Sequence, residues 1–109
     1  MMTMIDETTI SMAAEALLRA APVGAIVILF GSYADGTARV DSDLDFLVVE
    51  PEPKERFHEM ARLSRILGDM LIPADVVVIS LENYDRYRNR PNTIAYEASK
   101  KGRVYESIT

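Results

Sequence analysis

The sequence predicts a small α/β (α+β) domain in which a mixed three-stranded sheet is flanked by about four helices. Three short apolar runs rich in β-branched residues predict the strands. Two longer stretches place apolar residues at helical spacing, and prolines and glycines separate these segments. A chain of 109 residues has room for one core, so we treat residues 1–109 as a single domain.

Each expected element has a local signal in the chain. Pro22 and Gly24 end the first amphipathic stretch, Gly31 stops the first apolar run, and prolines follow the second. Gly102 is well placed to cap a last helix before a short extended stub. In order, we expect a helix over residues 7–21, strands over 25–30 and 44–49, a helix over 54–70, a strand over 75–79, short helices over 82–89 and 93–101, and the stub at 104–105.

Composition excludes several classes of function. Lys and Arg total 12 against 17 for Asp and Glu, so the net charge is -5 and stable nucleic-acid binding by the chain alone is not expected. The lack of cysteine excludes thiolate metal sites and disulfides, and it fits a cytoplasmic protein. No stretch has the pattern of a signal peptide or a membrane span, so we expect a soluble protein with no membrane partner.

The segment between the first two strands carries the clearest chemical pattern. Gly31 and Ser32 directly follow the first strand, and ten residues separate them from Asp43, which with Asp45 opens the second strand. Gly31 lets the backbone approach a ligand, and Ser32 is suited to cap a short helix whose free N–H groups could face a phosphate. Asp43 and Asp45 lie two apart in a strand, so both side chains project from one face and could grip divalent ions.

Asp75 joins this group through the expected topology. It begins the third strand after a helix long enough for a crossover, so the second and third strands can pair in parallel. Asp43, Asp45 and Asp75 then lie at one end of the sheet, and an antiparallel first strand brings Gly31 to the same end. Taken singly, such residues are usually turn formers. Together they favour a metal site, because acids placed in apolar strands are costly unless a cation neutralises them.

At these residues the sequence resembles the DNA polymerase beta-type nucleotidyltransferase superfamily. Gly31, Ser32, Asp43 and Asp45 match the GS-x10-DxD motif of that superfamily, and Asp75 matches its third carboxylate. The chain's length and its closing IAYEASKKGRVYE are similar to the smallest branch, the minimal nucleotidyltransferases (MNT) that are paired with HEPN ribonuclease toxins. One position departs: Asp35 stands where relatives often carry Arg, which removes a positive charge near the nucleotide.

The resemblance implies a polymerase beta-like fold and an antitoxin that transfers AMP from ATP to a tyrosine of a cognate HEPN toxin, in a hetero-oligomer. Asp43, Asp45 and Asp75 would be the catalytic residues and would hold two Mg2+ ions. Gly31 and Ser32 would bind the β- and γ-phosphates, and Asp75 would orient or deprotonate the acceptor hydroxyl.

Two other functions remain open at this point. The chain could be an antitoxin that only covers the toxin, with a vestigial metal site, or a small-molecule nucleotidyltransferase. His58 is expected to be a solvated helix residue, because no second His or Cys accompanies it. The basic and aromatic cluster over residues 86–90 is expected to be a solvated face, with a partner surface as the alternative.

Overall fold

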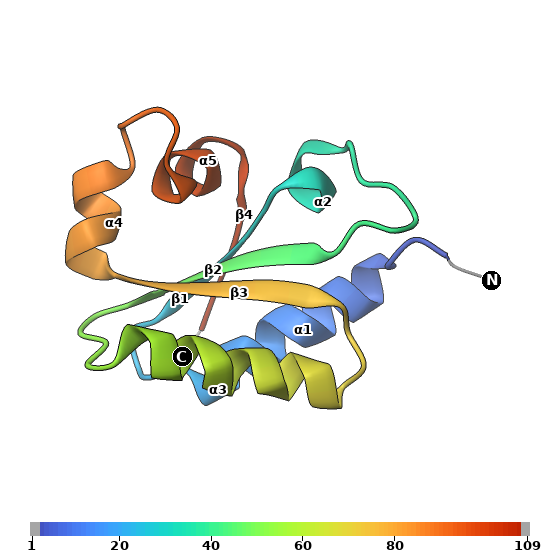
Figure 1. Cartoon of the computed structure of the whole chain (residues 1–109), viewed down its shortest axis with the longest axis horizontal. Helices are drawn as coiled ribbons and strands as arrows, with labels where there is room; N and C mark the ends of the chain where they lie inside the picture. Colours follow the sequence, from blue (N-terminus) through green and yellow to red (C-terminus); the bar gives the residue numbers. More distant parts are fainter. Residues whose placement is uncertain (1–2, 108–109) are drawn as a thin grey trace.

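A mixed four-stranded sheet, in the order β3-β2-β1-β4, organises the protein (Figure 1). The computed structural model describes residues 3–107. The elements are α1 (Glu7–Ala20), β1 (Ile26–Phe30), α2 (Ser32–Asp35), β2 (Leu44–Glu50), α3 (Arg56–Asp69), β3 (Ala74–Ser80), α4 (Leu81–Tyr87), α5 (Ile94–Lys101) and β4 (Arg103–Glu106).

Helices cover both faces of the sheet. The larger core lies between the sheet and helices α1 and α3, and it is filled by strand residues such as Phe46 and Val48 together with Leu17 and Leu63. A smaller core on the opposite face joins strand residues, Leu47 among them, to α4 and α5. Figure 1 shows the two pairs of helices on opposite sides of the strands. The sequence of β2 is almost continuously apolar because both faces of this strand are covered.

The predicted strand directions are confirmed. β1 pairs antiparallel with β2, and β2 pairs parallel with β3, with α3 as the connection between the parallel strands. In the parallel pair Asp45 lies opposite Asp75, and Leu47 lies opposite Val77. The end of β1 and the beginnings of β2 and β3 therefore meet at one end of the sheet.

The sheet has one strand more than the sequence predicts. The stub expected at residues 104–105 belongs to β4, which pairs antiparallel with β1. Gly102 precedes it, and a Cβ there would collide with the Ala98 carbonyl and the Ile28 side chain, so glycine permits the close approach. Within residues 3–107 there are five helices, because residues 32–35 form one turn of helix, α2.

The caps of the longer helices follow ordinary side-chain chemistry. Asp6 accepts a hydrogen bond from the Thr9 amide at 2.8 Å and begins α1, and Thr93 caps α5 in the same way. Phe57 of α3 is a large apolar residue that faces solvent: it is 74% exposed, and the Arg56 guanidinium lies 5.0 Å from the centre of its ring. Among the helices of residues 3–107, none is long and apolar enough to cross a bilayer.

Candidate active site

Three predicted carboxylates come together at the end of the sheet where β2 and β3 begin. Asp45 and Asp75 are direct register partners in adjacent strands, which lie about 4.8 Å apart in a sheet. Asp43 precedes β2 and lies two residues before Asp45. Alternation along the strands places Asp45 and Asp75 on the face of Leu47 and Val77, which is the face covered further along by α4 and α5.

Gly31 brings the start of α2 against the same carboxylates. Its φ is +77°, and a Cβ at this position would collide with the Asp45 carboxylate. Glycine is therefore required here for two reasons: other residues rarely adopt this φ, and the missing Cβ lets the backbone approach the Asp45 carboxylate closely. Gly31, not Ser32, is the N-cap of α2, so the expected capping role of Ser32 is wrong: Ser32 is the first helical residue, and Gly31 takes the non-helical geometry.

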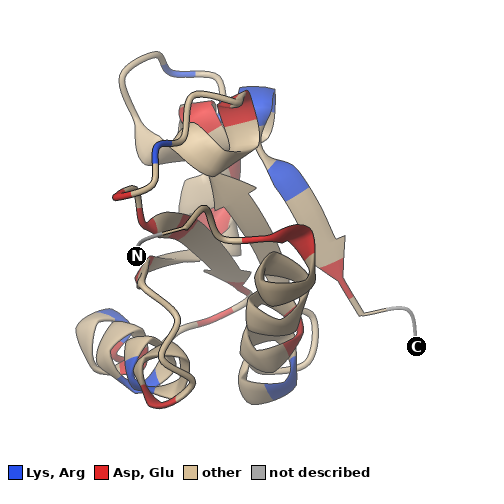
Figure 2. Cartoon of the chain, turned by 90° about the vertical axis from the view of Figure 1, so that its right-hand side faces the viewer, with Lys and Arg blue, Asp and Glu red and all other residues tan. Residues whose placement is uncertain are grey.

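Like charges and burial shape the electrostatics of this site. Burial raises the pKa of the half-buried Asp45, and the neighbouring carboxylates of Asp75 and Asp43 raise this pKa further. Asp43 and Asp75 themselves are exposed. Figure 2 looks onto this end of the sheet and shows acidic positions at the beginnings of the central strands. A cation bound here would relieve the repulsion among these carboxylates.

The carboxylates suit Mg2+ in their chemistry, because hard divalent cations prefer oxygen ligands. Within residues 3–107, however, no three His, Cys, Asp or Glu side chains already lie close enough together to hold a metal ion. Mg2+ also binds habitually through one or two carboxylates plus the phosphates of a substrate. The residues therefore fit a metal that is held jointly with a nucleotide.

Asp35 has a local role in the loop that follows α2. Its Oδ1 accepts hydrogen bonds from both the Thr37 amide, at 3.0 Å, and the Thr37 hydroxyl, and these bonds lower the pKa of Asp35. Gly36 then reverses the chain at φ +83°. Asp35 thus stabilises the turn between the two halves of the motif, while it leaves this position with a negative charge.

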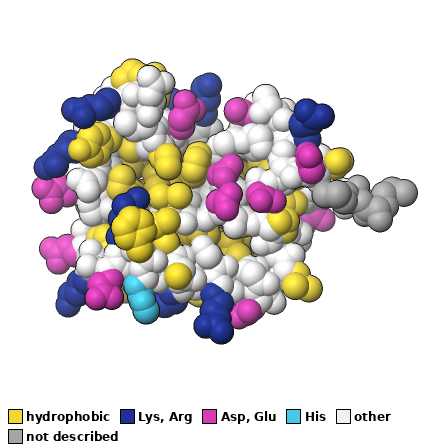
Figure 3. All heavy atoms as spheres, in the orientation of Figure 1, with side chains coloured by type: hydrophobic (Ala, Val, Ile, Leu, Met, Phe, Trp, Pro, Cys, Tyr) yellow, Lys and Arg dark blue, Asp and Glu magenta, His cyan; other side chains and the backbone are white. Residues whose placement is uncertain are grey.

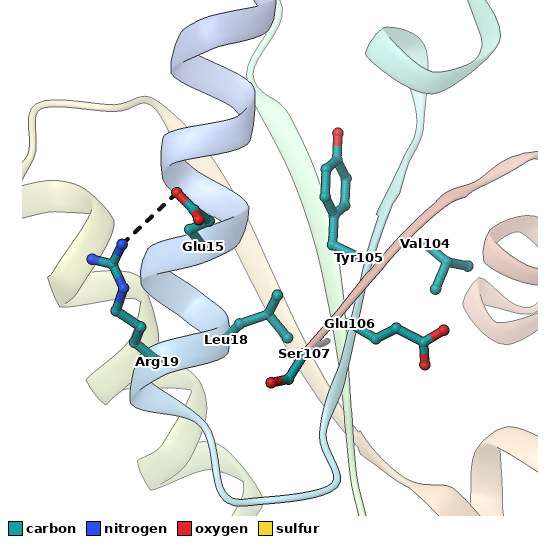
Figure 4. A pocket seen from close by; sticks show the side chains of 7 residues that line it. All are labelled: Glu15, Leu18, Arg19, Val104, Tyr105, Glu106 and Ser107. Atoms are coloured by element: carbon teal, nitrogen blue, oxygen red, sulfur yellow. Dashed lines mark ion pairs between the residues drawn. The ribbon is translucent and has the colours of Figure 1, made fainter. Parts of the chain in front are cut away.

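An apolar pocket of about 260 Å³ begins two residues farther along β2 and β3 than Asp45 and Asp75, at Leu47 and Val77. Its floor is formed by β2 and β3, and its walls by α4, α5, the loop between them and Arg56 at the start of α3. In Figure 3 hydrophobic side chains are exposed beside a group of acidic side chains near the centre of this face. A larger cavity of about 620 Å³ lies between α1 and β4, where Glu15 and Arg19 form an ion pair at 3.8 Å beside Leu18 and Tyr105 (Figure 4). This larger cavity contains none of the motif residues.

Glu50 is a buried titratable residue that sequence reasoning missed. It ends β2 and is only 2% exposed. Burial, together with hydrogen bonding to Glu59, raises the pKa of Glu50 to about 8, whereas Arg62 lowers the pKa of Glu59. Because Glu50 precedes Pro51, it looks like a strand terminator; the uninterrupted apolar run before it was the available signal of burial.

The basic cluster over residues 86–90 is largely compensated within the chain. Arg86 pairs with Glu82 at 3.4 Å and Arg88 with Asp85 at 3.8 Å, all on exposed side chains. Arg90 lies over the Tyr87 ring at 5.0 Å. These contacts fit the solvated face expected from the sequence. His58 is exposed on α3.

Comparison with known proteins assigns the family. The nucleotidyltransferase domain family matches residues 10–105, so the chain belongs to this family, and the predicted class of enzyme is confirmed. No curated protein matches the chain.

Solved structures share the fold. A protein from Sulfolobus solfataricus assigned as a nucleotidyltransferase has a TM-score of 0.60 at 22% identity, covering 88% of this chain and 75% of its own. A toxin–antitoxin structure with AMP-PNP has a TM-score of 0.57 at 20% identity, with 88% and 73% covered. A Shewanella oneidensis complex of tri-AMPylated HEPN toxin with MNT antitoxin has a TM-score of 0.55 at 16% identity, with 89% and 72% covered. At these identities the likeness concerns the fold.

Proposed function

We propose that residues 1–109 act as a single-domain, Mg2+-dependent antitoxin of the MNT type, which transfers AMP from ATP to a tyrosine hydroxyl of a HEPN toxin in the cytoplasm. The observation that carries this proposal is the meeting of Gly31, Asp45 and Asp75 at one end of the sheet in a chain of the nucleotidyltransferase family. The Shewanella oneidensis complex, in which the HEPN toxin is AMPylated, supports the choice of a HEPN toxin as the partner that receives AMP.

Different residues of the site bind the phosphates and the metal ions. Gly31 and Ser32 bind the β- and γ-phosphates through the backbone at the start of α2, beside Asp45. Asp43, Asp45 and Asp75 would hold two Mg2+ ions together with those phosphates. When bound, Mg2+ neutralises phosphate charge and lowers the pKa of the attacking hydroxyl.

Asp75 lies on the side of the site away from Gly31, because β2 separates β3 from β1 in the sheet. It orients the acceptor hydroxyl and takes its proton. A bond forms between the acceptor oxygen and the α-phosphorus, the bond between that phosphorus and the bridging oxygen breaks, and pyrophosphate leaves.

Two features favour a second candidate, an antitoxin that acts by binding alone. Asp35 adds a negative charge to the phosphate-side loop, and the carboxylates do not form a complete metal site without further ligands. Transfer of label distinguishes the two functions, because a binding antitoxin forms a complex with its toxin and leaves it unmodified.

The test uses ATP labelled at the α-phosphate, Mg2+, the purified chain and the product of the adjacent gene. We expect label on the partner protein with the wild type and none with the double variant Asp43→Asn and Asp45→Asn. Asp41→Asn, an exposed acid in the same loop, is the matched control and should transfer normally. The metal-free double variant should be as stable as the wild type or more stable, since like-charge repulsion is removed. A tight, unlabelled complex would establish the binding antitoxin, and label on a small acceptor alone would establish a small-molecule enzyme.

A further inference from the structure

The apolar pocket that begins at Leu47 and Val77 has no role in the reaction as described so far. We propose that it binds the phenol ring of the acceptor tyrosine and thereby selects an aromatic hydroxyl over an aliphatic one. This inference rests on the proposed nucleotidyl transfer. The lining residues that the argument uses are Leu47, Arg56, Val77, Ile79, Thr93 and Ile94.

The pocket continues the face of the sheet that carries the carboxylates. Leu47 and Val77 are register partners, and each lies two residues beyond Asp45 or Asp75 in its strand. Two residues along a strand span about 6.5 to 7 Å, a separation that a phenol hydroxyl and an aspartate side chain can cover only by extending toward each other. A ring seated on Leu47 and Val77 can therefore present its hydroxyl at Asp75.

The order of strands assigns this pocket to the acceptor. The phosphate-binding Gly31 follows β1, Asp45 lies on β2 and Asp75 on β3. The pocket floor consists of β2 and β3 residues, and none of the lining residues comes from β1. In an in-line displacement the leaving pyrophosphate and the attacking hydroxyl lie on opposite sides of the α-phosphorus. An occupant on the β3 side is on the side of the attacking group.

The chemistry of the lining favours a phenol over a purine, the other flat ring in the reaction. The Arg56 Nε donates to the Val78 carbonyl, and the single Thr93 hydroxyl proton is shared between the Arg90 and Tyr87 carbonyls, at 2.8 and 3.1 Å, so the Arg56 Nη groups remain as side-chain donors of the lining. The Thr93 oxygen also accepts from the Tyr96 amide at 3.1 Å. A purine has several ring nitrogens and an amino group that need partners, and burying them unpaired is costly. A phenol has one polar group, which would leave the pocket toward Asp75.

The test measures ring binding by NMR on the full chain with Mg2+ and α,β-methylene-ATP, whose α–β linkage resists cleavage. N-acetyl-L-tyrosinamide is the acceptor probe, and N-acetyl-L-serinamide and adenosine are the comparison ligands. We expect the tyrosine probe alone to shift the methyl signals of Leu47, Val77 and Ile79. The nucleotide analogue should shift the amides of Gly31 and Ser32, and the tyrosine probe should leave its affinity unchanged.

A matched pair of variants tests the pocket wall. Ile94 and Leu81 are each the first residue of a short helix and are 44% and 42% exposed, but only Ile94 lines the pocket. Ile94→Ala should weaken the tyrosine probe about fivefold, whereas Leu81→Ala should leave it unchanged and both should bind the nucleotide analogue normally. Melting curves establish that both variants are folded.

Several results would overturn the pocket assignment: adenosine shifting the pocket methyls, the serine probe binding as well as the tyrosine probe, or Ile94→Ala binding the tyrosine probe like wild type. Failure of the proposed transfer is measured separately, as the absence of label from ATP on the partner protein, and failure of the nucleotide site as Gly31 and Ser32 amides that do not respond to nucleotide and Mg2+. The methyl signals report ring binding in either case.

Discussion

Gly31 determines both the path of the backbone and the room for a carboxylate in the candidate site. Its positive φ turns the chain from β1 into α2, and its missing Cβ leaves the space that the Asp45 carboxylate occupies. The start of α2 and the Asp45 carboxylate thus touch at one position that only glycine can fill without displacing Asp45.

Gly31→Ala is therefore expected to damage both stability and function. The strained backbone and the displaced carboxylate should lower the free energy of unfolding by on the order of 1–3 kcal/mol, and transfer should be lost. Gly68→Ala is the control, because a Cβ at this position in α3 meets nothing and should stabilise by up to about 1 kcal/mol. Chemical denaturation measures the stability of both variants. Normal transfer by Gly31→Ala would show that the contact with Asp45 is incidental.

At the residue scale the sequence predicts the motif better than its surroundings. The positions of Gly31, Asp43 and Asp45 in the sequence predict that these residues lie close together. They stand where one strand ends and the next, antiparallel strand begins, and those two points are neighbours in a sheet. The cap of α2 and the burial of Glu50 are not predictable from spacing. Gly31 packs against Asp45, which follows it by fourteen residues, and Glu50 interacts with Glu59 and Arg62 of α3, so both features arise from tertiary packing.

At the scale of elements, the parallel pairing of β2 and β3 determines where Asp75 lies. If Asp75 accepts the proton of the attacking hydroxyl, then Asp75→Asn should lower the rate of transfer by at least about 100-fold while ATP affinity changes little. Single-turnover transfer and equilibrium ATP binding on the same preparation measure the two quantities. A rate close to that of wild type would remove Asp75 from the reaction, and an equal loss of affinity would make it chiefly a ligand for the nucleotide's metal.

Glu50 connects the far end of β2 to the helices on the α1–α3 face. Glu59 accepts from the Arg62 Nε at 2.7 Å, and Arg62 also donates to the Ala20 carbonyl at 2.8 Å. The cluster therefore joins β2, α3 and α1 at the end of the sheet opposite the carboxylates of the candidate site. Because the pKa of Glu50 is raised to about 8, this carboxyl group is mostly protonated in the folded chain at neutral pH.

This raised pKa predicts how stability depends on pH. Between about pH 4.5 and 8 the folded chain keeps a proton on Glu50 that the unfolded chain releases, so stability falls as pH rises through this range. The contribution of one such group is at most about 1.4 kcal/mol per pH unit. Glu50→Gln keeps the shape without the ionisation, so its melting temperature should fall less between pH 6 and 9. Glu52→Gln, at an exposed neighbour, should behave like wild type, and equal pH profiles for all three proteins would contradict the assignment.

Most helices and strands are predictable from the sequence, because their apolar residues follow long periodic patterns and are buried in the fold. β4 was the exception: its four residues alternate between half-buried and exposed, and only Val104 and Tyr105 carry the extended pattern. Its pairing with β1 depends on the close approach at Gly102, a tertiary contact that no local pattern reveals.

At the scale of the whole molecule, charge and fold together define what the site needs. The chain carries a net charge of -5, and three of its acids gather at one end of the sheet. An ATP molecule alone would bring further negative charge to that end, and a metal ion alone would find too few ligands already in place. Binding of each is therefore expected to depend on the other.

This coupling predicts that Mg2+ and ATP together raise the melting temperature by more than the sum of their separate effects. A ligand that binds only the folded state adds RT ln(1 + [L]/Kd) to the free energy of unfolding. Where two ligands complete one site together, each lowers the Kd of the other, and their combined effect exceeds the sum. Differential scanning fluorimetry with each ligand alone, both, and both plus excess EDTA measures the effect. Nucleotide should reach millimolar concentration, since Asp35 places a negative charge in the phosphate-side loop. The double variant Asp43→Asn and Asp45→Asn should lose the combined shift while it keeps its own melting temperature. Purely additive shifts in the wild type would mean that metal and nucleotide bind independently, and the candidate site would then not be their common site.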